Sequence, residues 1–288
     1  LQASIAAGFL MSRVIIRDIT SENEAASMIG YVTMGMSIIP LFAPGLGGLI
    51  QMLLGWPSIF LIMSLLGLLL LLLVFRDLGE TKIIKKNKNT KSSASFINLF
   101  WEAKFWGYSF TLAFSAGTFF SFLGGAPYVA TKVYNLNSVV SGLVMGFPAA
   151  GYFIGNYLSG RYSKFYGIDY MALRGILLVI FGMFICLVIT VFYRDTPYFF
   201  FGLCSFVGLG NGLIIPNASV GILSVNENLS GTAGGIGNAI MIGTGAILAS
   251  LTSYYLENQS SSSYLVFIML LSGALSYTSF YIFVLRNK

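Results

Sequence analysis

The chain alternates between long apolar runs and short polar segments, and this pattern defines its organisation. A helix needs about 20 apolar residues to cross a hydrocarbon core of about 30 Å. On that basis we predict nine membrane-spanning helices, at residues 1–16, 30–54, 57–75, 104–130, 138–159, 171–193, 197–223, 233–256 and 264–285. A transmembrane barrel would instead show alternating stretches of about ten residues, and no such stretches occur in this sequence. We therefore expect an all-α, polytopic transmembrane helical bundle.

One long polar segment, residues 76–95, divides the predicted spans into three before it and six after it. It contains the densest cluster of cations in the chain: Arg76, Lys82, Lys85, Lys86, Lys88 and Lys91. Lys and Arg in short loops are retained on the cytoplasmic side of a membrane. We therefore place this segment in the cytoplasm. Alternation of the spans then puts every Lys and Arg on that side except Lys132 and Arg194.

This orientation gives a three-part organisation. Residues 1–75 are predicted to be the remainder of a first bundle, residues 76–103 a cytoplasmic central loop, and residues 104–288 a second, six-helix bundle. The C-terminus would then also lie in the cytoplasm.

The composition supports insertion in a lipid bilayer. Hydrophobic residues make up 56% of the chain and charged residues 9%, whereas a soluble domain has about 25% charged residues. The net charge of +6 is explained by cations in cytoplasmic loops, so we expect no nucleic-acid partner. The chain has no His, and both Cys residues fall inside apolar spans. We expect no cofactor and no metal site.

Charged residues are confined to loops and to the ends of spans. The first span ends at Arg13, Arg17 and Asp18, which we interpret as a solvated cytoplasmic cap in preference to a functional group. All ten acids also lie in loops or at span ends. A carboxylate in mid-span would have been a natural proton carrier, because a charge there is costly and is retained for function.

Three amides lie at membrane depth, where an amide without a partner is costly. They are Asn211, Asn217 and Asn238. Two interpretations remain open: hydrogen bonds between helices, which we favour, and contact with a substrate in a wet cavity.

Small residues and prolines mark a second set of candidates. Gly30, Pro44, Gly47 and Gly48 should bend the second span and let a neighbouring backbone approach closely. Helix packing alone explains them, and a gating role is the sharper alternative. Arg161 ends the fifth span and is either an interfacial anchor or part of a gate.

These motifs occur in a specific order along the chain: Ala43-Pro44 with Gly47-Gly48, then Gly155-Asn156, Gly160-Arg161, GLGNGLIIPNA and SGTAGG. In this order they resemble the major facilitator superfamily, and within it the Bcr/CflA-like drug-resistance branch, from Leu1 to Lys288. The resemblance implies two six-helix bundles with the substrate between them. About nine of twelve helices would be present. The chain would be N-terminally truncated, with the proton-carrying carboxylate in the missing helices.

The resemblance also implies a function. The chain would belong to a proton-coupled efflux antiporter of the bacterial inner membrane, a monomer that exports drugs or small amphipathic compounds and is not an enzyme. Tyr128, Asn211, Asn217 and Asn238 would line or support the substrate cavity, and the bundle would offer no fixed charge to a ligand. Gly30, Pro44, Gly47 and Gly48 would shape the second span, with Arg161 at the cytoplasmic face. The alternatives are a carrier for a metabolite or nutrient, and a transport-incompetent fragment of a split or truncated gene.

Overall fold

The computed structural model describes residues 5–77, 96–193, 196–226, 229–258 and 261–286, and within these ranges the chain is helical without any strand. The helices are α1 (Ile5–Ile19), α2 (Glu22–Leu54), α3 (Pro57–Asp77), α4 (Phe96–Trp101), α5 (Ala103–Tyr128), α6 (Ser138–Val144), α7 (Gly146–Tyr166), α8 (Ile168–Phe192), α9 (Pro197–Ser224), α10 (Ser230–Asn258) and α11 (Ser262–Phe280). Two π-helical turns, η2 (Val129–Val133) and η4 (Tyr281–Leu285), extend α5 and α11. The predicted all-α fold is confirmed.

Six of these helices are long and apolar enough to cross a membrane: α3, α5 with η2, α8, α9, α10 and α11 with η4. The other three predicted spans overlap α1, α2 and the pair α6–α7. One expected boundary is wrong, since the predicted span 138–159 is divided at Met145 and α7 continues to Tyr166. Pro148 explains the restart at this point. A proline in the first turn of a helix removes no hydrogen bond, because that N–H has no partner within the helix.

The predicted central loop is partly helical. Helix α3 continues to Asp77, and the short α4 precedes α5. The cations from Lys82 to Lys91 lie outside the described residues.

The second bundle, formed by α5 to α11 with η2 and η4, is held together by close contacts between helix backbones. A Cβ added to Gly208 of α9 would overlap the carbonyl oxygen of Pro148 in α7, and one on Gly151 of α7 would overlap that of Ser205. Membrane helices gain no hydrophobic driving force from one another, so small residues that allow van der Waals contact stabilise their association.

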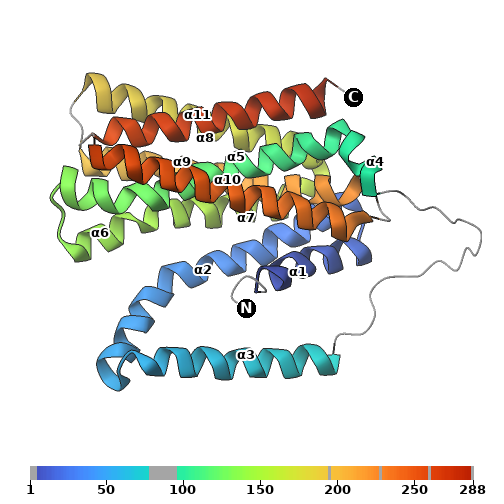
Figure 1. Ribbon diagram of the computed structural model, residues 1–288, viewed down its shortest axis with the longest axis horizontal. Coiled ribbons are helices and arrows are strands. Elements are labelled where there is room, and N and C mark those ends of the chain that lie inside the picture. Colours follow the sequence, from blue (N-terminus) through green and yellow to red (C-terminus); the bar gives the residue numbers. More distant parts are fainter. Residues whose placement is uncertain (1–4, 78–95, 194–195, 227–228, 259–260, 287–288) are drawn as a thin grey trace, which may run out of the picture.

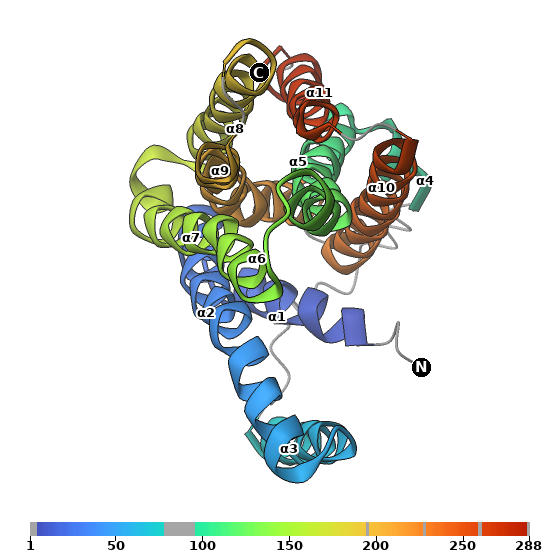
Figure 2. The ribbon, with the colours of Figure 1, turned by 90° about the vertical axis from the view of Figure 1, so that its left-hand side faces the viewer.

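Hydroxyl groups add hydrogen bonds between helices of the same bundle. Ser272 of α11 donates to the carbonyl oxygen of Phe114 in α5 at 2.7 Å. Ser253 of α10 donates to that of Gly124, also in α5, at 3.1 Å. These bonds fasten α10 and α11 to α5, which lies between them (Figure 2).

The helices before residue 78 are arranged differently. Figure 1 shows α2 lying beside α7 over its first part and then curving away to join α3, which runs apart from the second bundle. None of the α3 residues is buried. Helix α2 is curved in Figure 1, and the residues responsible for this bend stay a prediction. Pro44, Gly47 and Gly48 belong to this helix, but their side chains lie outside the described residues.

Candidate functional site

Helix α1 contacts the second bundle through two arginines on one face. Arg13 is only 5% exposed, and its Nη1 donates to Ser219 Oγ of α9 at 2.7 Å. One turn later, Arg17 Nε donates to Ser224 Oγ at 3.0 Å. The prediction that Arg13 belongs to a solvated cap is therefore wrong. The reason is tertiary packing, because α1 lies against α9 and α10 and covers this side chain.

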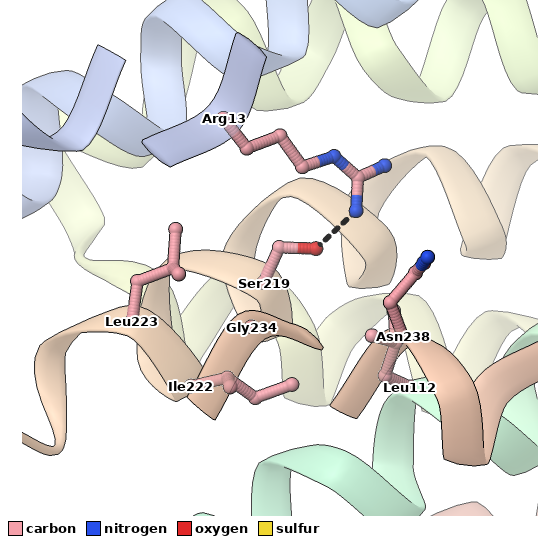
Figure 3. A pocket seen from close by; sticks show the side chains of 7 residues that line it. All are labelled: Arg13, Leu112, Ser219, Ile222, Leu223, Gly234 and Asn238. Atoms are coloured by element: carbon pink, nitrogen blue, oxygen red, sulfur yellow. Dashed lines mark hydrogen bonds between the residues drawn. The ribbon is translucent and has the colours of Figure 1, made fainter. Parts of the chain in front are cut away.

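Arg13 borders a small pocket between the first helices and the second bundle. The pocket is lined by residues of α1, α5, α9 and α10: Arg13, Leu112, Ser219, Ile222, Leu223, Gly234 and Asn238. In Figure 3 the guanidinium of Arg13 and the amide of Asn238 extend into the same space, beside the Ser219 hydroxyl. The cavity volume is about 10 Å³, room for about one water molecule. The pocket is therefore too small in this conformation for a drug-sized ligand.

The lining combines an apolar wall with hydrogen-bond donors. The guanidinium, the hydroxyl and the amide can all donate, and a guanidinium binds carboxylate or phosphate oxygens in a bidentate manner. Electrostatic attraction is also stronger in a poorly hydrated site than in water. The sequence led us to expect no fixed charge in the bundle, whereas the structure places the Arg13 guanidinium at this pocket.

Asn211 and Asn217 both lie buried in α9 and join helices of the second bundle. The Asn211 amide oxygen accepts from Ser115 Oγ of α5, and its Nδ2 lies 3.4 Å from Thr118 Oγ1. Asn217 donates to Ser159 Oγ of α7 at 2.9 Å. In this conformation both amides form hydrogen bonds between helices. This arrangement corresponds to the first of the two interpretations that the sequence left open.

Of the four predicted cavity residues, Asn238 lines the pocket described above. Tyr128 ends α5 and packs against the hydrophobic core. It lies about 24 Å along the helix from Leu112, at 1.5 Å per residue. The structure therefore does not bring Tyr128 and Asn238 together. The cavity roles of all four residues stay predictions.

Of the predicted gating residues, Gly30 lies where α2 crosses α7. A Cβ on Gly30 would lie 2.5 Å from the backbone nitrogen of Gly160, so the two helices touch at this point. On either side, Ser27 Oγ donates to the Gly160 carbonyl and Thr33 Oγ1 donates to Asn156 Oδ1. This crossing joins the first helices to the second bundle.

Arg161 follows this crossing but points to the surface. It is exposed, and its Nη1 donates to the Tyr157 hydroxyl at 2.9 Å. This hydrogen bond raises the pKa of Arg161.

A bundle of membrane-length helices with a polar pocket shared between its two parts is the architecture of a membrane transporter. The chain belongs to the Major Facilitator Superfamily, whose family model matches residues 2–250. The family consists of transporters, and the protein is a multi-pass membrane protein of that kind.

Relatives refine this membership. The bicyclomycin resistance protein homolog of Haemophilus influenzae is 27% identical over 98% of this chain and 71% of its own length. Multidrug resistance protein D of Escherichia coli is 25% identical over 93% of this chain and 67% of its own length. The MFS-type transporter YdgK of Bacillus subtilis is 27% identical over 54% of this chain and 40% of its own length. The predicted Bcr/CflA-like drug-resistance branch is confirmed.

Proposed function

We propose that the protein is a proton-driven exporter of drugs or small amphipathic compounds in the bacterial inner membrane. The observation that carries this proposal is the pocket where Arg13 of α1 meets Ser219 of α9 and Asn238 of α10. A carrier with alternating access binds its substrate between its two halves. The names of the resistance proteins that match most of the chain support drugs as the substrate class.

The contacts around the pocket suggest how it opens and closes. Arg17 with Ser224 and Ser27 with Gly160 join the two parts near the end of α9 and the start of α2. In the proposed topology this end faces the cytoplasm. Loading from the cytoplasm then requires these contacts to separate, and a pocket with room for one water molecule must widen. Re-forming the contacts would close the cytoplasmic path and leave release to the outside.

Arg13 predicts one chemical feature of the substrate. A desolvated guanidinium favours compounds with an acidic or oxygen-rich group placed beside an apolar body, which Leu112, Ile222 and Leu223 can cover. The seven residues that line the pocket include no carboxylate. A coupling carboxylate would therefore lie outside this pocket lining, with the proton bound there and not at Arg13.

Everted inner-membrane vesicles test the proposal most simply. The complete native polypeptide is expressed in a bacterial strain without its own drug exporters. An acidic vesicle lumen should then drive drug accumulation, and a protonophore should abolish it. Arg13→Gln should lower the initial rate about tenfold or more, because loss of a charge-assisted hydrogen bond costs about 1.5–3 kcal/mol. Arg13→Lys should retain part of the rate, and Arg286→Gln, at an exposed arginine, should not change it.

A carrier for an acidic metabolite is the second candidate, and the buried guanidinium is the observation that favours it. The same vesicles separate the two functions. Transport of a labelled carboxylate metabolite without any drug transport would support the metabolite carrier and overturn drug export.

A further inference from the structure

The turn between α7 and α8 carries exposed cations and aromatic rings that the transport site does not use. We call this set the α7–α8 patch: Arg161, Tyr162, Lys164, Phe165, Tyr166, Tyr170 and Arg174. Phe165 is 70% exposed, Tyr166 is 59% exposed and Tyr170 is 43% exposed. Large rings this accessible, at the turn that leads into a helix long enough to cross a membrane, favour a partner or a specific environment.

Gly167 creates the geometry of the patch. Its φ of 81° lies in the left-handed region that glycine adopts without strain, so α7 can end and α8 can begin at a single residue. As a result, Tyr170 of α8 stacks on Tyr166 of α7 with ring centroids 5.2 Å apart. Tyr166 in turn lies 6.1 Å from Tyr162. Three rings thus form one continuous row across the turn.

Each cation of the patch lies beside a ring. The Arg161 guanidinium is 5.7 Å from the centroid of the Tyr162 ring, and that of Arg174 is 5.0 Å from the Tyr170 ring. Lys164 Nζ lies 4.8 Å from the ring of Phe165. Arg161 is also held by the Tyr157 hydroxyl. These contacts restrict the cations at the surface before any ligand arrives.

Two acids lie close to the patch, and both have other partners. Asp169 accepts a hydrogen bond from the Tyr108 hydroxyl of α5, on the inner side of the turn. Glu24 of α2 is exposed and accepts from Ser21 Oγ at 2.7 Å, although it also attracts Lys164. Arg161 and Arg174 are the two guanidinium groups of the patch, and both residues are exposed.

We propose that the α7–α8 patch binds the headgroup phosphate of an anionic phospholipid. Aromatic rings at the end of a membrane helix favour the interfacial region of a bilayer. A guanidinium matches phosphate oxygens in a bidentate manner. The net positive charge of the patch favours an anionic lipid over a zwitterionic one. Phosphatidylglycerol satisfies all three conditions, since it has a phosphate diester with one negative charge and acyl chains that stay in the bilayer.

Native mass spectrometry of the complete polypeptide in detergent tests this site. The protein is titrated with an equimolar mixture of phosphatidylglycerol and phosphatidylcholine that share the same acyl chains. The unsubstituted protein should bind phosphatidylglycerol preferentially. The double variant Arg161→Gln, Arg174→Gln should lose about fivefold in affinity for each cation removed. Equal affinity of the unsubstituted protein for the two lipids would overturn the proposal.

The control is a double variant that also removes two positive charges, at positions outside the patch. Lys104 and Arg286 are exposed cations near the start of α5 and the end of η4, and their Gln double variant should change affinity less than about twofold. Equal losses in the two double variants would show a general charge effect and contradict a specific site. If the first variant fails to fold, Arg161→Lys with Arg174→Lys keeps the charge but removes the bidentate guanidinium geometry, so the affinity for phosphatidylglycerol should fall while the protein stays folded. Unchanged affinity in this variant would contradict recognition by the two guanidinium groups.

A competition experiment distinguishes a lipid from a soluble phosphate. Glycerophosphoglycerol, the deacylated form of phosphatidylglycerol, keeps the phosphate diester without acyl chains and should not displace phosphatidylglycerol at similar concentrations. Displacement at equal concentration would mean that the patch recognises a soluble phosphate, and the lipid assignment would be wrong.

Discussion

Helices α9 and α3 are both strongly apolar, yet they pack in opposite ways. Most residues of α9 are buried, and its glycines touch the backbones of α7 and α8. Helix α3 consists largely of leucine and has no buried residue, and a Cβ on its Gly67 would meet nothing within 4 Å. Hydrophobicity therefore predicts membrane insertion but not helix association. Association follows the small residues and hydroxyls that lie at the helix contacts of the second bundle.

Helices α1 and α2 lie between these extremes. Helix α2 packs closely along α7, with Ala25, Ala26 and Ile29 buried, and α1 contacts the second bundle through polar groups such as Arg13 with Ser219. A junction of this kind can separate without unfolding either side, as alternating access requires. The second bundle should therefore respond to substitution as a folding unit, and the junction as a moving contact.

The largest effect is expected for Gly208→Leu. A side chain here would overlap the Pro148 carbonyl oxygen of α7, and neither backbone can move without disrupting the other. We expect a loss of about 3 kcal/mol in the free energy of unfolding, measured by denaturant titration in detergent. Gly67→Leu is the matched control in α3 and should leave that free energy unchanged. Similar effects at both positions would remove the contrast between the two helices.

At the junction, Gly30→Leu should separate α2 from α7 without unfolding the second bundle. The added side chain must displace the Gly160 backbone, at a cost of about 1–3 kcal/mol. A disulfide between Thr33→Cys and Asn156→Cys reports the contact, since the native side chains are hydrogen-bonded. Gly30→Leu should abolish this cross-link.

Gly35→Leu is the control on the same helix, because a Cβ there meets nothing within 4 Å. It should preserve the cross-link. A cross-link of normal yield in Gly30→Leu would contradict the close crossing of the two helices.

Asn211→Ala should cause a smaller loss, of about 1 kcal/mol in the free energy of unfolding, because it removes hydrogen bonds from Ser115 and to Thr118 of α5. Asn238→Ala should affect transport more than stability, because Asn238 lines the pocket. Thermal unfolding and drug transport measured on the same preparations check this contrast. A larger loss of stability in Asn238→Ala, together with a larger loss of transport in Asn211→Ala, would contradict the roles given to the two amides.

The smallest effect is expected at the start of α2. Glu24 accepts from the hydroxyl and the backbone N–H of Ser21, and these bonds hold the pKa of its carboxyl below the ordinary value of 4.5. The stabilisation that these hydrogen bonds give to the start of α2 is therefore complete above the pKa that Glu24 has in the unfolded chain. It is lost as pH falls through the lower pKa that Glu24 has in the folded protein. Hydrogen exchange in the first turn of α2 should accelerate over that acidic range, after correction for intrinsic rates. Glu24→Gln should show no such step.

Much of the architecture follows from the apolar pattern. The positions of α3, α5, α8, α9, α10 and α11 were predictable because a bilayer requires long apolar runs. The division at Met145 was not predicted, because α6 and α7 form one apolar run in the sequence.

The site was harder to predict because it depends on tertiary contacts. Arg13 and Ser219 are separated by 206 positions in the chain, and a charge near the end of an apolar run resembles an ordinary interfacial residue. The available signal was the four-residue spacing of Arg13 and Arg17, which places both on one helix face toward a common neighbour.

The most direct test of the central claim is protection of a cysteine at Asn238 by drug. In the complete transporter, Asn238→Cys is labelled with a membrane-permeant thiol reagent, against a background set by the buried Cys186 and Cys204. A transported drug at about ten times its Kd should slow labelling about tenfold, while Gly231→Cys, exposed at the start of α10, should react at the same rate with or without drug. Equal labelling of Asn238→Cys in the presence and absence of drug would contradict a substrate site at this pocket.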